Sequence, residues 1–346
     1  MAPLGYFMNW NANKRSVVLD LTTGEGRELL LRLAEHADVF VENYGPGVVQ
    51  KLDIDYDVIR QANPSIIYAS VKGFGLSGPN ANRKCFDGVA QAAAGALSIT
   101  GYADAEPLLP GPTTGDSGTG VQLALAITAA YVQKLRTGEG QRIEVSMQEA
   151  MTYYMRTRVG ITPGWGERAA PRVGNGSMAL NNVYSAAGGG PNDYVMIMAV
   201  TPRMFTDLCA AMQRPDLADD PRFNSYSGRI ANAAELRAEI AGWTGQYDKF
   251  EVGRRLEAHG VPGGPVLDTT EVLTDPHLIA RGFIKTVQHP DHGPVPMLGF
   301  APRLSESEVE MRAAPGLGEH TDEVLGRVLG LGTDELDALR SRSVIG

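Results

Sequence analysis

The chain has 346 residues and a formal charge of −9, from 31 Lys and Arg against 40 Asp and Glu. At roughly 150 residues per domain this length predicts about two domains, and the acidic excess disfavours nucleic acid as a partner. No apolar run approaches the roughly 18 residues that span a membrane, two cysteines are too few for a disulfide scaffold, and the start lacks the pattern of a signal peptide, so we expect a cytoplasmic protein with no membrane partner.

Strand-like apolar runs alternate with helical patterns in the first half of the chain. We predict strands at residues 16–21, 38–42, 65–71 and 141–145, and a long buried helix at residues 117–135 that ends at Gly138. Residues 22–25 (TTGE) and 146–149 (SMQE) have the spacing of a capping box at a helix start. This alternation is typical of an α/β fold, in which helices cover a parallel sheet.

The second half of the chain begins with residues 161–177, which are dense in Gly, Pro and Arg and predict a linker or functional loop. A hairpin around residues 188–191, a strand at residues 194–200 and two or three helices up to His259 follow, and they could form a smaller α+β unit. An amphipathic stretch at residues 321–329 predicts a last helix.

The segment with the clearest chemical potential is GDSGTG at residues 115–120, directly before an apolar helix. At a helix N-terminus, free backbone N–H groups and the helix dipole favour a negative charge, so Asp116 would stay ionised and could act as a nucleophile. The glycines would let another molecule approach the backbone. The alternative is that Asp116 only caps the helix, since Asp is a favoured capping residue.

Other polar side chains stand at strand ends. Lys14 and Arg15 precede a predicted strand and could meet a phosphate, although a solvated charged pair is the usual outcome for such residues. Lys72 follows a strand, where open α/β sheets bind ligands. Asn43 and Tyr44 could hold a flat heterocycle or simply form a turn.

Two kinds of site are disfavoured. His289 and His292 lie three residues apart without an evident third ligand, so we expect no metal site. No strand is followed by a complete G-x-G-x-x-G, and G-x-S-x-G is missing, which argues against a dinucleotide-dependent dehydrogenase and a serine nucleophile elbow.

Seven short motifs together resemble class III CoA-transferases, the CaiB/BaiF family of formyl-CoA and carnitine CoA-transferases. In chain order they are NKRS at 13–16, VENYGPG at 41–47, SVKGFG at 70–75, GDS at 115–117, TGEGQ at 137–141, GVP at 260–262 and GEHT at 318–321. The resemblance runs nearly from end to end, and the ordered set is more specific than any one motif.

The resemblance implies a Rossmann-like large domain built from both ends of the chain, with a smaller α+β domain inserted between them, in a homodimer of interlocked rings. The boundaries expected here are residues 1–160 for the first part of the large domain, 161–177 for a linker, 178–266 for the small domain and 267–346 for a linker and the return to the large domain.

The resemblance also implies a CoA-transferase in which an aspartate attacks an acyl-CoA thioester, and Asp116 occupies the place of that aspartate. Acyl-CoA and a carboxylic acid would be the substrates, with no tightly bound cofactor. The residues that would contact CoA are Asn43, Tyr44, Lys72, Lys14 and Arg15, together with Lys51, which stands where the formyl-CoA enzymes carry arginine.

Three departures from the family pattern qualify this interpretation. A glycine run expected after residues 172–175 is replaced by residues 176–181 (GSMALN), which predicts an acceptor larger than formate or oxalate. The racemase branch carries a Gly-His-Asp motif where this chain has Cys85, Phe86 and Asp87, so a 2-methylacyl-CoA racemase is disfavoured because phenylalanine transfers no proton. The resemblance also predicts an opening strand-helix-strand segment, for which the twelve residues before Asn13 are too few, and this leaves a non-catalytic CoA-binding scaffold as an alternative.

Overall fold

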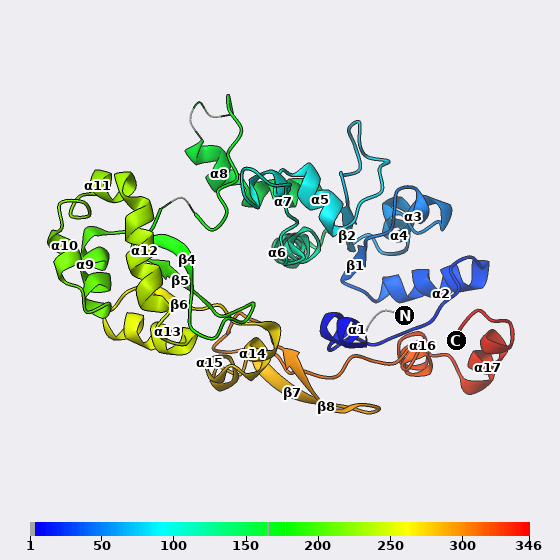
Figure 1. The fold of residues 1–346 in the computed structure, drawn as a ribbon. Helices are drawn as coiled ribbons and strands as arrows, with labels where there is room; N and C mark the ends of the chain where they lie inside the picture. Colours follow the sequence, from blue (N-terminus) through cyan, green and yellow to red (C-terminus); the bar gives the residue numbers. More distant parts are fainter. Residues whose placement is uncertain (1–3, 163, 165, 177) are drawn as a thin grey trace. The chain divides into compact units, whose positions relative to one another are not determined.

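A computed structural model describes residues 4–162, 164, 166–176 and 178–346 (Figure 1). Three positions of the predicted linker, Pro163, Trp165 and Ser177, therefore lie outside the described residues. The chain divides into two compact units, the first formed by Met1–Thr100, Pro107–Pro171 and Lys285–Gly346 and the second by Gly101–Glu106 and Arg172–Ile284. The fold is mixed α/β, with a parallel sheet in the first unit.

The parallel sheet consists of β1 (Val39–Glu42), β2 (Ile67–Lys72) and β3 (Arg142–Ser146), in that spatial order. Three of the predicted strands are thus confirmed within a residue or two at each end. In the register of β1 and β2, Glu42 lies opposite Ser70. Because the strands are parallel, their carboxyl ends meet at one edge of the sheet, where ligands bind in open α/β folds.

The predicted strand at residues 16–21 is wrong. In this segment Leu19 forms an isolated antiparallel bridge with Ile345, and the segment belongs to no sheet. Its backbone N–H groups instead bond to groups near the C-terminus, since Val18 donates to Thr321 Oγ1 and Asp20 donates to the Val344 carbonyl. An apolar, extended segment can satisfy its backbone in this way without a strand partner.

Helices of the first unit begin and end largely where their capping residues predict. Ser146 caps α7 (Met147–Tyr154) as predicted, and Gly138, with a positive φ of 76°, ends α6 (Thr114–Thr137). The cap of α2 (Gly24–Glu35) is Thr23, which accepts from the Gly26 N–H, one residue after the start of the predicted box at 22–25. The prediction that α6 is buried is wrong, because Leu125 and Leu135 are about 70% exposed on one side of it. The opposite side packs on β2, β3, α5 and α7.

The remaining helices and strands that lie wholly or mainly in the first unit are short. They are α1 (Leu4–Asn11), α3 (Val48–Lys51), α4 (Tyr56–Ala62), α5 (Asp87–Ala93), a 3-10 turn (Leu97–Ile99), α8 (Arg156–Ile161), β7 (Ile284–His289), β8 (Gly293–Leu298), α16 (Thr321–Leu329) and α17 (Thr333–Ser341). The predicted helix at residues 321–329 is confirmed as α16. Leu325 of this helix packs with Leu29 of α2, so the end of the chain joins the core of the first unit.

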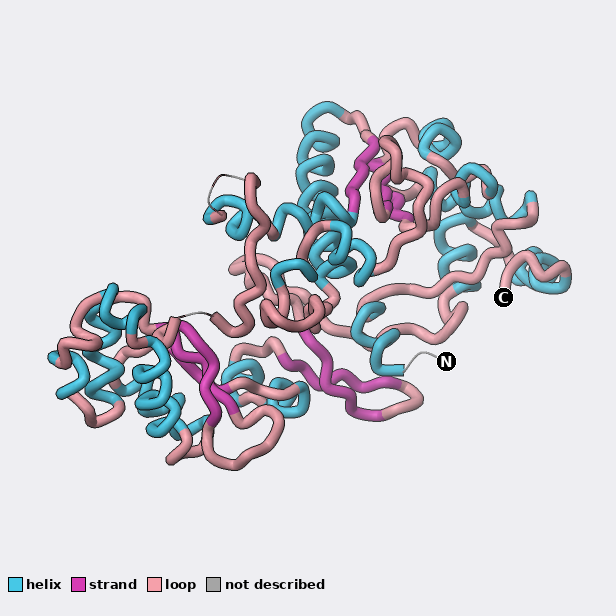
Figure 2. Tube along the Cα trace, turned by 45° about the horizontal axis from the view of Figure 1, so that its top comes forward, coloured by secondary structure: helices cyan, strands magenta, loops and turns pink. Residues whose placement is uncertain are grey.

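The second unit contains an antiparallel sheet of β4 (Asn181–Ser185), β5 (Tyr194–Met198) and β6 (Gly263–Pro265), visible as magenta strands in Figure 2. The hairpin of β4 and β5 confirms the turn predicted at residues 188–191. Five helices, not two or three, precede His259: α9 (Pro202–Ala211), α10 (Asp216–Asp219), α11 (Tyr226–Ala231), α12 (Ala233–Thr244) and α13 (Lys249–Ala258). Two further short helices, α14 (Thr269–Thr274) and α15 (Pro276–Ala280), follow β6.

The core of the second unit lies between its sheet and its helices. Val195 and Ile197 of β5 are fully buried against Phe205 and Leu208 of α9 and Leu256 of α13. This unit therefore has its own hydrophobic core. Among the described residues of either unit, no helix combines the length and the apolar character needed to cross a membrane.

Candidate active site

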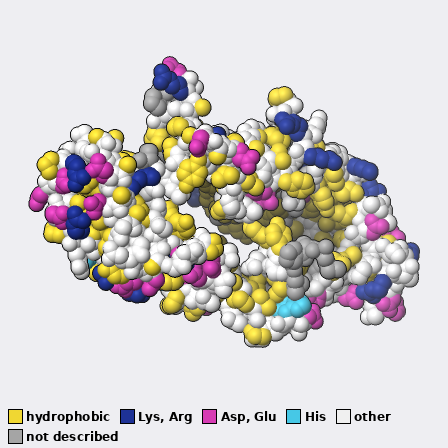
Figure 3. Space-filling model, viewed as in Figure 1, with side chains coloured by type: hydrophobic (Ala, Val, Ile, Leu, Met, Phe, Trp, Pro, Cys, Tyr) yellow, Lys and Arg dark blue, Asp and Glu magenta, His cyan; other side chains and the backbone are white. Residues whose placement is uncertain are grey.

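The carboxyl ends of β1 and β2 open onto a cavity of about 980 Å³ in the first unit. The space-filling view shows the surface hollowed near α1, with hydrophobic side chains on the visible walls (Figure 3). The walls come from the two strand ends, the loop before α5, the start of α6, and α1. Five of the predicted site residues line this cavity: Lys14, Asn43, Tyr44, Lys72 and Asp116.

Asp116 lies in the first turn of α6, as the sequence predicts. It does not cap the helix, however, because the N-cap residue is Thr113. Its backbone N–H donates to Asp87 Oδ1 at 3.2 Å. The described residues offer its carboxylate no hydrogen-bond partner, so the side chain is available to a ligand in the cavity.

Close packing of α6 against α5 fixes the position of Asp116. A Cβ atom on Gly115 would lie 2.8 Å from both the carbonyl oxygen and Oδ1 of Asp87, which is too close for any side chain. Asp87 is held in turn by Gln91 of α5, whose Nε2 donates to Asp87 Oδ2 at 2.7 Å. Gly115 is therefore required by the approach of the two helices, and its absent side chain seats Asp116 at the cavity wall.

The electrostatic surroundings of Asp116 differ from those expected at a helix N-terminus. Burial, and then the neighbouring carboxylate of Asp87, raise the pKa of the Asp116 carboxyl above its ordinary value of 3.8. Desolvation and a like charge both disfavour the anion, and they therefore oppose the effect of the helix dipole. A carboxylate with a raised pKa is a stronger nucleophile than an ordinary aspartate once it is ionised.

Lys72 lines the cavity, but its ammonium group points into the sheet edge. Its Nζ donates to Glu42 Oε2 at 2.7 Å and to the backbone carbonyl of Tyr44 at 2.7 Å. The side chains of Lys72 and Glu42 are only 6% and 1% exposed. The positive charge of Lys72 is therefore paired inside the protein.

The comparisons with known proteins agree with the motifs. A model of CoA-transferase family III matches residues 2–321. The chain belongs to this family. It is 39% identical to the formyl-CoA:oxalate CoA-transferase of Streptomyces avermitilis over 98% of this chain and 86% of that protein, and 36% identical to the enzyme of the same name from Rhodopseudomonas palustris strain BisA53 over 94% and 81%. A CaiB/BaiF family protein from Brucella suis has a similar structure, with a TM-score of 0.83 at 32% identity over 94% of this chain and 84% of that one.

Membership of CoA-transferase family III confirms the resemblance deduced from the seven motifs and makes this protein an enzyme that transfers CoA from a thioester to a carboxylic acid. The alternative of a non-catalytic scaffold is not favoured, because relatives named as transferases match over nearly the whole chain.

Two predicted CoA-binding residues of this CoA-transferase lie outside the cavity lining. Arg15 forms an ion pair with Glu323 at 3.1 Å. Lys51 is the last residue of α3 and is exposed. Lys14 does line the cavity, although its Nζ also donates to the Trp10 carbonyl at 2.9 Å. The roles of these three residues stay predictions.

Sequence reasoning missed two cations in the lining, Arg83 and Lys84. Arg83 lies over the ring of Phe74 at 5.0 Å, and Lys84 has no ion-pair partner among the described residues. The sequence signal was available, because both residues follow closely after the motif that ends at Gly75. Tyr6 and Trp10 of α1 also line the cavity and were not predicted.

Residues 85–87, of which Cys85 and Phe86 line the cavity, carry no imidazole. Phe86 is 80% exposed beside the cavity, and Cys85 packs so tightly against Gly73 that a Cβ on this glycine would lie 2.1 Å from the Cys85 Cβ. Burial and the charge of Asp116 raise the pKa of the Cys85 thiol. These side chains therefore supply no evident base for moving an α-proton.

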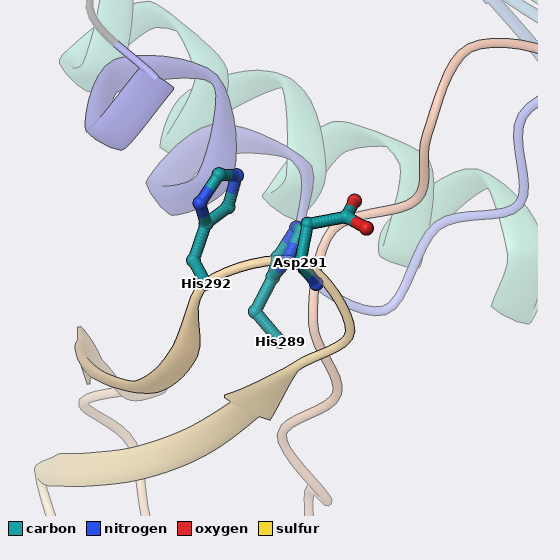
Figure 4. A group of neighbouring side chains, drawn as sticks. All are labelled: His289, Asp291 and His292. Atoms are coloured by element: carbon teal, nitrogen blue, oxygen red, sulfur yellow. Dashed lines mark hydrogen bonds between the residues drawn. The ribbon is translucent and has the colours of Figure 1, made fainter.

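The hairpin turn between β7 and β8 holds a third donor beside the two histidines considered for a metal. His289, Asp291 and His292 each offer one atom within 4.8 Å of the others (Figure 4). The side chains of Asp291 and His292 are exposed, and His289 Nδ1 already accepts a hydrogen bond from the Asp291 N–H at 3.1 Å. The expectation of no metal site stays a prediction.

Proposed function

We propose that Asp116 is the covalent carrier of this CoA-transferase. The observation that supports this role is the position of its carboxylate, which has no described hydrogen-bond partner and lines a large cavity together with cations and an amide. A nucleophilic carboxylate can split a difficult exchange between a thioester and a free acid into easier steps. No proton transfer is required, because every reacting group is a carboxylate, a thiolate or an acyl derivative.

The proposed exchange has four steps, and in each of them one acyl bond forms and one breaks. An Asp116 oxygen attacks the thioester carbonyl carbon, the C–S bond breaks, and an acyl-aspartyl anhydride and CoA thiolate form. The thiolate attacks the Asp116 carbonyl carbon, which releases the first acid and leaves an aspartyl-CoA thioester. The acceptor carboxylate attacks that thioester and expels CoA thiolate, giving a second anhydride. The thiolate then attacks the acceptor's carbonyl carbon, and Asp116 returns to its free form.

Recognition of CoA follows from the two kinds of cavity wall. Asn43 and the half-exposed ring of Tyr44 offer an amide and an aromatic surface for the adenine base. Lys14, Arg83 and Lys84 bring positive charge to the same cavity, where the phosphate groups of CoA would be neutralised. We expect CoA and acyl-CoA to bind here as substrates and no cofactor to be tightly bound.

The test is an Asp116→Asn variant. Wild-type protein incubated with acyl-CoA should give an adduct on the peptide that contains Asp116, detectable by mass spectrometry or as a hydroxamate after hydroxylamine. The variant should lose both the adduct and the exchange of CoA. Asp57→Asn is a matched control, because Asp57 is also in the first turn of a helix but is exposed outside the cavity. Unchanged exchange by Asp116→Asn would refute the proposal.

The acceptor acid is the less defined substrate. The relatives' names make formyl-CoA and oxalate the first pair to assay. The bulkier residues in place of a glycine run, Met178 to Asn181 among those described, support an acceptor larger than formate or oxalate. A panel of mono- and dicarboxylic acids of increasing length, tested with one acyl-CoA donor, would contradict this expectation if oxalate gave the highest kcat/KM.

We also propose that two copies of the chain form the homodimer expected of the family. Val121, Leu125, Val132 and Leu135 are exposed and lie along one side of α6, because their spacing follows the helical repeat. The buried residues of α6, such as Leu123 and Ala130, face the other way. The four exposed residues form a hydrophobic stripe on α6 that begins at the cavity wall, because Val121 also lines the cavity. Light scattering after size-exclusion chromatography should give the mass of two chains.

A further inference from the structure

A buried ion pair connects the carboxyl ends of β1 and β2. Glu42 is the last residue of β1 and lies opposite Ser70 of β2, and strand alternation places Lys72 on the same face as Ser70. Glu42 Oε1 accepts a hydrogen bond from Ser70 Oγ at 2.5 Å, and Glu42 Oε2 accepts one from Lys72 Nζ at 2.7 Å. The carboxylate is thus fixed by two neighbours on the adjoining strand.

The same pair holds both polar groups of one backbone position in the following loop. The N–H of Tyr44 donates to Glu42 Oε2 at 2.9 Å, and the carbonyl of Tyr44 accepts from Lys72 Nζ at 2.7 Å. The next residues give the loop little support of their own, because Gly45 and Gly47 are conformationally permissive and Pro46 has no N–H to donate. The conformation of residues 43 and 44 therefore depends on the Glu42–Lys72 pair.

This arrangement has a consequence for the charge of the cavity. Lys72 and Glu42 carry opposite charges at 2.7 Å, and both side chains are more than nine-tenths buried. Their net contribution to the potential that a phosphate meets is small, because the two charges cancel at short range. Lys14, Arg83 and Lys84 have no carboxylate partner among the described residues and carry the free positive charge of the lining.

Resting on the proposed function, we propose that Lys72 is a positioning residue and not a phosphate ligand. Together with Glu42 it clamps the backbone of Tyr44, so that Asn43 and the Tyr44 ring face the CoA-binding cavity. The clamp sets the affinity for CoA through the shape of its adenine-binding wall. Lys84, in contrast, sets affinity through charge.

The experiment measures the affinity for CoA by calorimetry at about 50 and 200 mM salt, where screening separates a charge contact from a shape effect. Glu42→Gln with Lys72→Met removes both charges together and leaves the Tyr44 carbonyl without its donor. We expect a loss of affinity of about tenfold with the same salt dependence as the wild type. Lys84→Met is the control, and it should lose affinity mainly at low salt, with a flatter salt dependence.

Kinetics add a second readout. The clamp predicts that the double variant raises KM for acyl-CoA by a similar factor and leaves kcat within about threefold, because Asp116 lies on α6 and keeps its own contacts. Circular dichroism and a melting curve establish that the variant is folded. An unchanged Kd, or a salt dependence as flat as that of Lys84→Met, overturns the proposal.

If the double variant does not fold, Lys72→Arg decides the question. Arginine binds phosphate in two-pronged geometry, so a direct phosphate contact predicts equal or tighter CoA binding. The clamp predicts weaker binding, because the larger guanidinium would have to displace Glu42 or the Tyr44 carbonyl, each of which lies 2.7 Å from Lys72 Nζ. Failure of the wild-type protein to bind CoA would instead count against the proposed function, and the two failures are thereby distinguished.

Discussion

The Glu42–Lys72 pair makes a quantitative prediction about stability. Replacing Lys72 by Met leaves the Glu42 carboxylate buried without its cation and removes the donor to the Tyr44 carbonyl. Loss of one partner of a buried ion pair costs about 3–5 kcal/mol, whereas replacing both charges by well-packed neutral groups is often neutral. The side-chain exposures of 1% and 6% place this pair in the buried class, where solvent screening does not reduce the cost.

The expected result is a large penalty for the single variant and a smaller one for the double variant with Glu42→Leu. Each kcal/mol moves the melting temperature of a unit of this size by about 2–4 °C, so Lys72→Met should melt about 6–20 °C below the wild type. Differential scanning calorimetry at neutral pH measures this directly. An exposed pair such as Arg312–Glu310 is the control, since its loss should move the melting temperature by a degree or two at most. The reasoning fails if Lys72→Met melts within about 2 °C of the wild type or if the double variant is the less stable one.

Three further predictions concern the helix that carries Asp116. Gly115→Ala forces a Cβ within 2.8 Å of Asp87 and should lower the free energy of unfolding by about 1–3 kcal/mol in a urea titration. Gly120→Ala is the control, because the space around its Cβ is open, and it should not destabilise the protein. Equal effects of the two substitutions would contradict the packing argument. Asp87→Asn removes the like charge beside Asp116, so the pKa of Asp116 should fall. In a plot of kcat/KM against pH, the acidic limb should therefore move to lower pH. An unmoved limb would mean that Asp87 does not act on Asp116. Leu125→Asp with Leu135→Asp places charges on the exposed stripe of α6 and should convert the proposed dimer to single chains in light scattering. A dimer that survives both charges would be held by another surface.

The sequence predicts elements well where the signal is local. Thr23, Ser146 and Gly138 mark helix ends by chemistry that acts within one turn, and all three do so in the structure. The strand predicted at residues 16–21 fails because its partners, Thr321 and Val344, lie more than 300 residues further along the chain. A short apolar run carries no information about so distant a partner.

The features of the site likewise divide into those that short motifs predict and those that depend on residues far apart in the sequence. Asp116 and the strand-end residues Asn43, Tyr44 and Lys72 could be found from short motifs, and they do line one cavity. The direction in which Lys72 donates could not be predicted, because it depends on Glu42, which is 30 residues earlier and becomes a neighbour only when β1 and β2 pair. The raised pKa of Asp116 likewise comes from burial and then from Asp87, which approaches only because Gly115 leaves room for it.

The unfavourable surroundings of the Asp116 anion suit the covalent role proposed for this residue. In the free enzyme its charge is partly buried and lies near the carboxylate of Asp87. In either proposed covalent state, anhydride or thioester, Asp116 carries no charge, so both the desolvation penalty and the repulsion are relieved. The surroundings therefore raise the energy of the free carboxylate relative to its adducts, and an exchange between thioester and acid proceeds faster when its covalent intermediates do not lie far above the free enzyme. A helix terminus that stabilised the anion strongly would have the opposite effect.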